Sequence, residues 1–282
     1  MATGDSPYEA RHASIPGEWP MTRVVNFCRD FLGGAVLQLR LFRRSPAYLL
    51  VLIVPPFLST IFLSDARYYS HARVTAAPVL APALIGLWTV AVVVAQMVVT
   101  FDRGSYTLEI ITAAPAAFIN VVTGRVLTVV LFALVSVLEA LAVARFGFGV
   151  TVTIQHPVIF VLALLATAVA SAGTTTILMG AFLASRSAQR YANTLGYPFY
   201  ILAGLIVPVT FLPAWVRPIG DVVYLRWSAP LLYATVSRGA IPHPGGSLLL
   251  IMALGCAGYA IGALLIRMVI NRLRASGRIG LT

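Results

Sequence analysis

The sequence predicts an all-α integral membrane protein with six transmembrane helices. An amphipathic interfacial helix precedes the spans, a short charged helical segment separates two of them, and a region of re-entrant or external short helices precedes the last. Three observations predict this fold: the chain of 282 residues is 59% hydrophobic, it is only 10% charged, and its apolar residues are gathered in long runs. Soluble domains carry about a quarter charged residues, so the composition excludes an ordinary soluble protein.

The N-terminal part predicts two elements on the cytosolic side. Residues 1–23 contain no apolar run of the kind that a signal peptide needs, and we expect a disordered cytosolic tail. Residues 24–44 predict an amphipathic helix in the membrane interface, because their apolar residues recur at spacings of three and four. These apolar residues are Val24, Phe27, Phe31, Ala35, Leu39 and Phe42. The pair Gly33–Gly34 predicts a weak centre at which this helix bends.

Six apolar runs approach the roughly 20 helical residues that a hydrocarbon core of about 30 Å requires. They are residues 47–64, 78–101, 124–145, 157–184, 196–212 and 247–270. We expect residues 24–272 to form one six-span domain, followed by a second cytosolic tail at residues 273–282.

Arginine sets the orientation of these spans. The formal net charge is +11, and all 20 basic residues are arginine. With the spans placed as above, fourteen arginines lie on the side of the two termini and six on the other side. The positive-inside rule therefore places both termini in the cytosol, and it explains the basic charge without nucleic acid as a partner.

The run "DRGSYTLEIITAAPAAFINVVTGR", residues 102–125, joins the second and third spans on the cytosolic side. Gly104-Ser105 supplies a helix N-cap, and Pro115 stops the helix about two turns later. A helix this short is unstable alone in water and needs a partner surface. That surface is either another protein, or the protein's own cytosolic rim and the lipid headgroups.

Residues 205–246 are interrupted by prolines and contain no apolar run of spanning length. Non-helical backbone at membrane depth is tolerated only where protein or water shields it. The sequence therefore favours re-entrant or external short helices over an ordinary extracellular loop. An aromatic belt at the outer interface is indicated by Trp215, Tyr224, Trp227 and Tyr233.

Three regions, taken in order, resemble the type-2 ABC exporter permeases over residues 24 to 272. The run "FDRGSYTLEIITAAPAAFINVVTGR" is similar to the family's cytosolic segment, "LRLFRRSP" to its interfacial helix, and "LIVPVTFLPAWVRPIGDVVYLRWSAPLLYATVSRGA" to its outer region. The resemblance implies that the charged segment is a coupling helix that docks on a separate ATP-binding cassette ATPase. The docking residues would be Asp102, Arg103, Thr107, Leu108, Glu109 and Ile111.

The same resemblance implies a second permease copy or a sister permease, a substrate path lined by spans two and five, and a bacterial plasma membrane. The polysaccharide branch carries Leu-Gly-x-x-Trp at the entry to its first span. This chain has Arg44-Ser45-Pro46-Ala47-Tyr48 there instead. The departure favours export of a drug, an antibiotic or another amphiphile; a polysaccharide or lipid-linked glycan exporter is the alternative.

Candidate residues for the substrate path are Trp88, Thr89, Gln96, Asn193, Tyr197 and Tyr200. The alternative for each is a hydrogen bond between packed helices. Glu139 is the only acid inside a predicted span, and it either binds a cationic substrate or pairs with a neighbouring polar group. An ion-coupled secondary transporter would use Glu139 as its coupling acid.

The sequence shows no energy source of its own. A phosphate-binding loop needs a lysine, and the chain has none. Its four histidines are scattered, and no metal-ligand cluster is visible. We therefore expect no enzyme activity and no cofactor or metal bound by this chain, with ATP and Mg²⁺ held by the partner ATPase.

Overall fold

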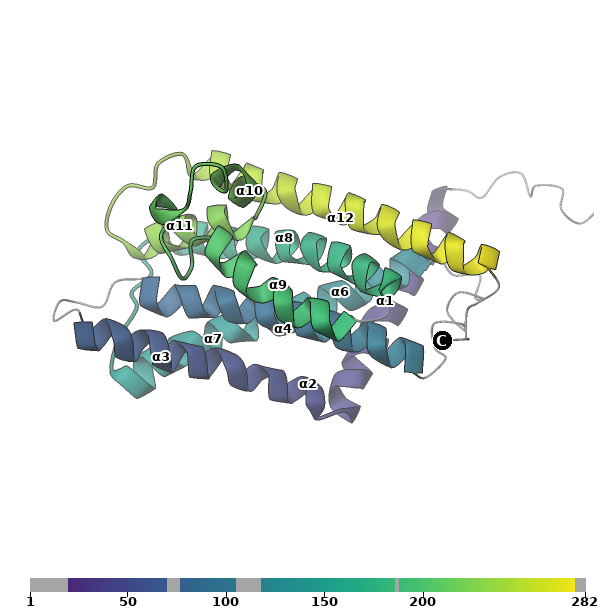
Figure 1. Ribbon diagram of the computed structural model, residues 1–282, viewed down its shortest axis with the longest axis horizontal. Coiled ribbons are helices and arrows are strands. Elements are labelled where there is room, and N and C mark those ends of the chain that lie inside the picture. The colour runs from purple at the N-terminus through teal and green to yellow at the C-terminus, as the bar shows by residue number, and fades with distance from the viewer. Residues whose placement is uncertain (1–19, 70–76, 105–117, 186–187, 277–282) are drawn as a thin grey trace, which may run out of the picture.

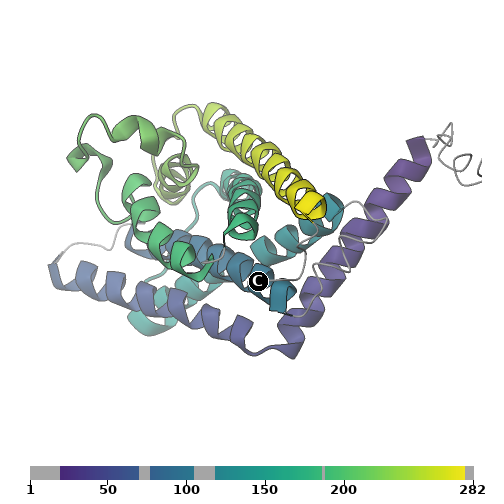
Figure 2. The same cartoon turned by 45° about the vertical axis from the view of Figure 1, so that its right-hand side comes forward.

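A computed structural model describes residues 20–69, 77–104, 118–185 and 188–276 of the chain. Within these residues the protein is helical and contains no strand, which agrees with the predicted class. Figure 1 shows long helices that follow one common direction, with helix α1 (Pro20–Arg44) crossing them at one end. Figure 2 shows α1 leaning away from the bundle, and α1 packs against α6 (Phe118–Ala133).

Four stretches of the described residues are long and apolar enough to cross a membrane. They are Ala77–Asp102, Ile119–Gly147, Pro157–Ala184 and Pro244–Arg272. The helices that form them are α4 (Ala77–Gly104), α6 with α7 (Val135–Ala142) and the π-helical turn η3 (Val143–Gly147), α8 (Pro157–Ala184), and α12 (Pro244–Ser276). The predicted second, third, fourth and sixth spans fall on these helices. Because α12 continues to Ser276, the start of the predicted C-terminal tail is helical.

The predicted first span is divided among three short elements. Residues 47–64 fall on α2 (Ala47–Leu50), the 3-10 turn η2 (Val51–Ile53) and α3 (Val54–Tyr69). Pro55 and Pro56 stand in the first turn of α3, where a missing N–H is tolerated, but they interrupt a helix that arrives from α2.

The predicted fifth span is misplaced along the chain. Helix α9 (Ala188–Leu202) begins before residue 196 and ends well before residue 212. Gly204 has a φ of +74°, which glycine adopts readily and other residues rarely do, and Pro208 follows it. The prediction of helix over 203–212 is therefore wrong, and the total of six spans stays a prediction.

The proline-rich region folds into short helices, as the sequence predicts. They are η4 (Val209–Phe211), α10 (Arg217–Asp221) and α11 (Leu225–Val236). Arg226 pairs with Asp221 at 3.0 Å and ties α11 to α10. The predicted aromatic belt is wrong for Tyr224, which is only 2% exposed, whereas Trp215 is largely exposed.

Helix α4 forms the centre of the fold. From Val79 to Val99 nearly all of its side chains are buried, and α4 packs against α3, α6, α7, α8, α9 and α11. A helix that is apolar on all sides is expected in such a position. Its C-terminal end carries Asp102, so α4 connects the interior of the bundle with the charged segment.

Close backbone contact holds two helix pairs together. On α8, a Cβ added to Gly173 would lie 2.1 Å from the carbonyl oxygen of Gly255 on α12, so small residues permit the close approach of these two helices. On α1, a Cβ added to Gly34 would lie 2.1 Å from the carbonyl oxygen of Val121 on α6. Helix α1 runs unbroken through Gly33–Gly34, and Gly34 permits the contact with α6, while the predicted bend stays a prediction.

Candidate functional site

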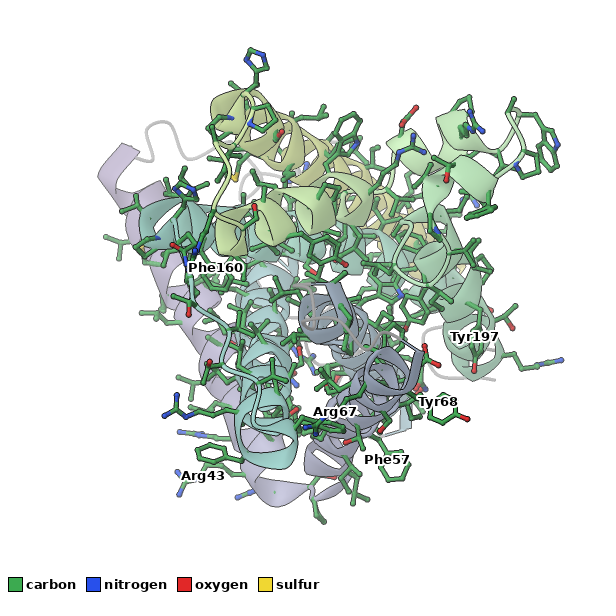
Figure 3. All side chains as sticks on the ribbon, turned by 90° about the vertical axis from the view of Figure 1, so that its left-hand side faces the viewer. Arg43, Phe57, Arg67, Tyr68, Phe160 and Tyr197 are labelled. Carbon is green, nitrogen blue, oxygen red and sulfur yellow. The ribbon has the colours of Figure 1, made fainter. Side chains whose placement is uncertain are left out.

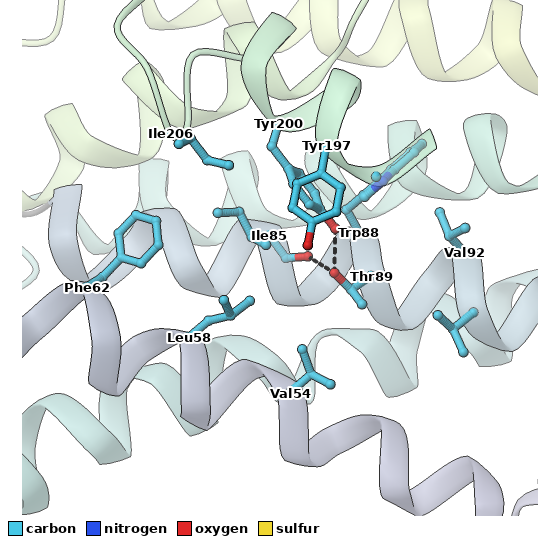
Figure 4. Close-up of a pocket in the computed structure, with 12 residues that line it drawn as sticks. Val54, Leu58, Phe62, Ile85, Trp88, Thr89, Val92, Tyr197, Tyr200 and Ile206 are labelled. Atoms are coloured by element: carbon cyan, nitrogen blue, oxygen red, sulfur yellow. Dashed lines mark hydrogen bonds between the residues drawn. The ribbon is translucent and has the colours of Figure 1, made fainter. Parts of the chain in front are cut away.

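A cavity of about 400 Å³ lies between α3, α4 and α9 (Figure 4). Small-molecule sites typically measure about 300–1,000 Å³, so this cavity can hold a small ligand. Helix α3 contributes the apolar side chains of Leu58 and Phe62 to its wall. None of the described residues that line the cavity is charged, and its polar groups are supplied mainly by tyrosine and threonine hydroxyls.

The indole ring of Trp88 forms part of the cavity wall on α4. It stacks on Phe199 of α9, with ring centroids 3.9 Å apart and ring planes 12° apart. On another side, the centroid of Tyr224 lies 6.4 Å away. Trp88 Nε1 is buried and has no hydrogen-bond partner among the described groups. The ring of Trp88 thus joins the cavity wall to Tyr224, which stands directly before α11.

A pair of hydroxyl groups joins α4 to α9 inside the cavity. The hydroxyl groups of Thr89 and Tyr200 lie 2.6 Å apart, and Thr89 Oγ1 also donates to the carbonyl oxygen of Ile85 at 2.8 Å (Figure 4). Because a threonine hydroxyl has one proton, Tyr200 donates to Thr89 while Thr89 donates to Ile85. The acceptor capacity of the Tyr200 oxygen stays available to a ligand.

Aromatic side chains continue from the cavity to the surface. Tyr197 lines the cavity and is 71% exposed, with its ring edge-on to that of Tyr200. Figure 3 shows Phe57 and Tyr68 of α3 and Tyr197 of α9 pointing outward on the same side of the molecule. The cavity therefore lies beside an exposed aromatic face.

At the other end of α4, an ion pair is buried where three helices meet. Arg125 Nη1 of α6 donates to Asp102 Oδ2 of α4 at 2.5 Å, and both side chains are almost fully buried. Arg125 Nε donates to Gln38 Oε1 of α1 at 3.2 Å. The ion pair thus links the two residues that bound the charged segment.

Comparison with known families places the sequence of this chain in one of them. Residues 35–237 match the family described as ABC-2 type transporter. The chain belongs to the ABC-2 type transporter family. No curated protein sequence matches the chain. Members of this family are multi-pass permease subunits of ABC transporters; they are generally not catalytic themselves and normally act with ATPase subunits. The matched range contains the cavity, the charged segment and the ion pair.

Four of the predicted path residues of this ABC-2 permease line the cavity. They are Trp88, Thr89, Tyr197 and Tyr200. Gln96 is buried further along α4, where it donates to Thr100 on the same helix. Asn193 belongs to α9, but its side chain lies outside the described residues. Glu139 belongs to α7 and does not line the cavity; its Oε2 has no hydrogen-bond partner among the described groups.

The predicted ATPase-coupling residues of the permease lie mostly outside the described residues. This applies to the side chain of Arg103 and to Thr107, Leu108, Glu109 and Ile111. Asp102 is described, and its carboxylate is bound to Arg125 of the same chain. A contact between Asp102 and an ATPase would require the carboxylate to leave that pair.

The contribution of α3 to the cavity was not predicted from the sequence. Leu58, Phe62 and Val54 are apolar residues of a predicted span, and such residues face lipid, core or cavity equally well. The predicted path residues are polar and aromatic side chains of spans two and five, which stand out in apolar segments. Only the packing of α3 on α4 shows that these residues face the cavity.

Tyr224 and Ser171 connect the outer helices to α8. Their hydroxyl groups lie 2.7 Å apart and are buried. Burial raises the pKa of the Tyr224 hydroxyl far above its usual value, so this group stays protonated at neutral pH. Among the described residues, no group of three histidine, cysteine or acidic side chains lies close enough together to hold a metal ion.

Proposed function

We propose that this ABC-2 permease exports an uncharged aromatic amphiphile, such as a drug or an antibiotic, as one half of a dimeric path driven by separate ATPase subunits. The observation that carries the proposal is the uncharged, aromatic cavity between α3, α4 and α9. Burying a charged group without a partner is strongly unfavourable, so a cavity of this kind selects neutral ligands. Aromatic rings gain contact area with Trp88 and Tyr200, and a hydroxyl or amine on the ligand can donate to the Tyr200 oxygen.

The path would be completed by a second permease copy or a sister permease. The exposed aromatic face formed by Phe57, Tyr68 and Tyr197 lies beside the cavity, and a second permease docked on it would enclose the cavity between the two chains. Obligate interfaces are apolar and rich in aromatic residues, in agreement with this face. We expect the mass of the purified assembly to correspond to two permeases per complex.

The ATPase would act through the coupling helix at residues 102–115. Glu109 and Arg103 would form charge-assisted contacts on the ATPase, and Leu108 and Ile111 would pack there. When ATP binding brings the two ATPases together, the coupling helices would move, and the attached ends of α4 and α6 would rock the bundle from an inward-open to an outward-open state. Both termini would lie in the cytosol of a bacterial cell, below its plasma membrane.

Two alternative functions are a glycan exporter and an ion-coupled transporter, and the cavity and Glu139 distinguish them from the proposed function. A polysaccharide or glycan exporter would need many hydrogen-bonding groups along its path, and the apolar cavity favours an amphiphile instead. An ion-coupled transporter would use Glu139, whose Oε2 has no described partner. Because Glu139 lies on α7 and outside the cavity lining, a direct contact with a ligand in this cavity is disfavoured.

The experiment is co-purification with the ATP-binding cassette subunit encoded beside the permease, followed by measurement of ATP hydrolysis with added ligands. We use two ligands of similar size, neutral 9-hydroxyfluorene and its charged carboxylate analogue. The neutral ligand should stimulate hydrolysis at lower concentration than the anion, and Tyr200→Phe should weaken stimulation severalfold. Equal stimulation by both ligands would contradict the proposed substrate class, and failure to assemble with any ATPase would contradict the proposed function.

A further inference from the structure

Three polar side chains from three helices meet at the end of the bundle where α4 joins the charged segment. They are Gln38 of α1, Asp102 of α4 and Arg125 of α6, and we name them the Gln38–Asp102–Arg125 cluster. All three are among the buried polar residues, with Gln38 fully buried and Arg125 only 2% exposed. Arg125 is the shared donor, to Asp102 at 2.5 Å and to Gln38 at 3.2 Å.

Helix α1 reaches this cluster through a narrow strip on one face. Every fourth residue is buried there: Asp30, Gly34, Gln38 and Phe42. Added Cβ atoms would lie 2.1 Å from Val121 O at Gly34 and 2.0 Å from Phe31 O at Gly124. The two backbones are therefore in direct contact. Gln38 is one helical turn beyond Gly34, and Arg125 follows Gly124, so the glycine crossing brings Gln38 and Arg125 together.

Helix α1 joins the hydrophobic core at its C-terminal end, where Leu41 packs on the core and the ring of Phe42 lies 4.4 Å from that of Phe132. Before that end, Val25, Phe27, Leu32, Val36 and Leu39 are exposed, whereas Phe31 and Leu37 are half-buried. Such a face suits the lipid interface, where it offers no fixed attachment to the bundle. Between residues 25 and 39 the fully buried residues are Asp30, Gly34 and Gln38, so the glycine crossing and the polar cluster supply the closest attachment of this part of α1 to the other helices.

The cluster contains a strong ion pair and also polar atoms that have no hydrogen-bond partner. A buried charge that loses its partner is costly, so Asp102 and Arg125 resist separation. However, Asp102 Oδ1, Arg125 Nη2 and Gln38 Nε2 are buried without a hydrogen-bond partner among the described groups. Polar groups with such spare donors and acceptors can exchange partners when the helices shift, while the ion pair stays closed.

We propose that the Gln38–Asp102–Arg125 cluster is a joint that makes α1 move together with α4 and α6. The inference rests on the proposed function, in which the ATPase displaces the segment between Asp102 and Arg125. The ion pair closes the base of that segment and fixes the ends of α4 and α6 to each other. Gln38 connects α1 to the same guanidinium, so a displacement of the segment also displaces the interfacial helix. All three are positioning residues.

The native cysteines allow a direct measurement of this movement. Cys28 of α1 and Cys256 of α12 are both exposed and carry spin labels without further substitution. We assemble the full-length permease with its ATPase in lipid nanodiscs, with one labelled permease per complex. Electron paramagnetic resonance then gives the distance between the labels without nucleotide and after trapping with ATP and vanadate. The wild-type distance should change on trapping.

Gln38→Met removes the contact of α1 with Arg125 and leaves the ion pair intact. In this variant, the change in the distance between the labels on trapping with ATP and vanadate should be at least twofold smaller than in wild type. ATP hydrolysis per complex should stay unchanged. The matched control is Asp221→Asn, which removes the Arg226–Asp221 pair on the outer helices and should leave the change in distance as in wild type.

Exchanging the charges of Asp102 and Arg125 tests the ion pair. The double variant also controls for misfolding of the single variant. Asp102→Arg alone should abolish the change in distance, and Asp102→Arg combined with Arg125→Asp should restore at least half of it. A full change in distance in Gln38→Met would overturn the joint, and so would a wild-type complex that hydrolyses ATP without any change. A folded, assembled double variant without recovery would overturn it as well. Failure of the wild-type chain to assemble with an ATPase would instead refute the proposed function.

Discussion

Gly33 and Gly34 are neighbours on α1 with opposite surroundings, so the same substitution at each predicts opposite results. A Cβ on Gly34 would lie 2.1 Å from Val121 O, whereas a Cβ on Gly33 would meet no atom within 4 Å. Real Cβ contacts essentially never fall below 3.0 Å, so Gly34→Ala must separate α1 from α6 by about the difference of 0.9 Å. A gap of that size forfeits roughly a quarter to a half of each dispersion contact along the crossing.

The magnitudes follow from helix propensity and packing. Replacing glycine by alanine inside a helix stabilises it by about 0.5–1 kcal/mol, and Gly33→Ala should show this gain. Overpacking costs about 1–3 kcal/mol, so Gly34→Ala should show a net loss of roughly 1–2 kcal/mol. For a chain of this size, 1 kcal/mol corresponds to about 2–4 °C in Tm. Gly33→Ala should therefore raise Tm by about 2 °C, and Gly34→Ala should lower it by about 4 °C.

The assay is thermal unfolding of the purified permease in detergent, followed by its tryptophan fluorescence. Gly124→Ala serves as a second test, because its added Cβ would lie 2.0 Å from Phe31 O on the opposite helix. It should behave like Gly34→Ala. Equal shifts of Tm in the same direction for Gly33→Ala and Gly34→Ala would refute the backbone contact between α1 and α6.

Three further predictions concern other parts of the molecule. Ser171→Ala should lower the unfolding free energy by about 1–3 kcal/mol, because it leaves the buried Tyr224 hydroxyl unpaired; an unchanged Tm would contradict this. Burial raises the pKa of Tyr224 above 10.0, so the stability gained from its protonated hydroxyl is complete below about pH 10 and is lost as the pH rises further. Tyr224→Phe should therefore lose less Tm than wild type as the pH rises above about 10. Because Glu139 lies outside the cavity lining, Glu139→Gln should change the export of cations and of neutral compounds equally; a selective loss of cation export would show that this acid contacts substrate.

The long spans could be predicted from hydropathy, and the interrupted ones could not. Helices α4, α8 and α12 are continuous apolar segments whose length alone predicts a span. The first and fifth predicted spans are also apolar runs, but Pro55, Gly204 and Pro208 change the local backbone. Hydropathy averaged along the sequence contains no information on backbone conformation. The ends of α3 and α9 therefore differ from the prediction.

The candidate cavity was predicted in part, for a similar reason. Aromatic and hydroxyl side chains such as Trp88 and Tyr200 stand out in an apolar segment and can be selected from the sequence. Phe62 of α3 has no such distinguishing feature. The Asp102–Arg125 pair was also missed, because the two residues were interpreted as parts of a surface segment. Gln38 of α1, which binds Arg125, lies 87 residues before it in the chain, so the sequence gives no sign of this contact.

The central claim is that this ABC-2 permease moves its substrate only when a separate ATPase drives it. The most direct measurement is uptake of labelled 9-hydroxyfluorene into sealed inside-out vesicles, with the permease alone and with its ATPase partner, in the presence and absence of ATP. We predict ATP-dependent accumulation with both subunits and none with the permease alone. Accumulation by the permease alone, driven by ATP or by a proton gradient, would contradict the claim.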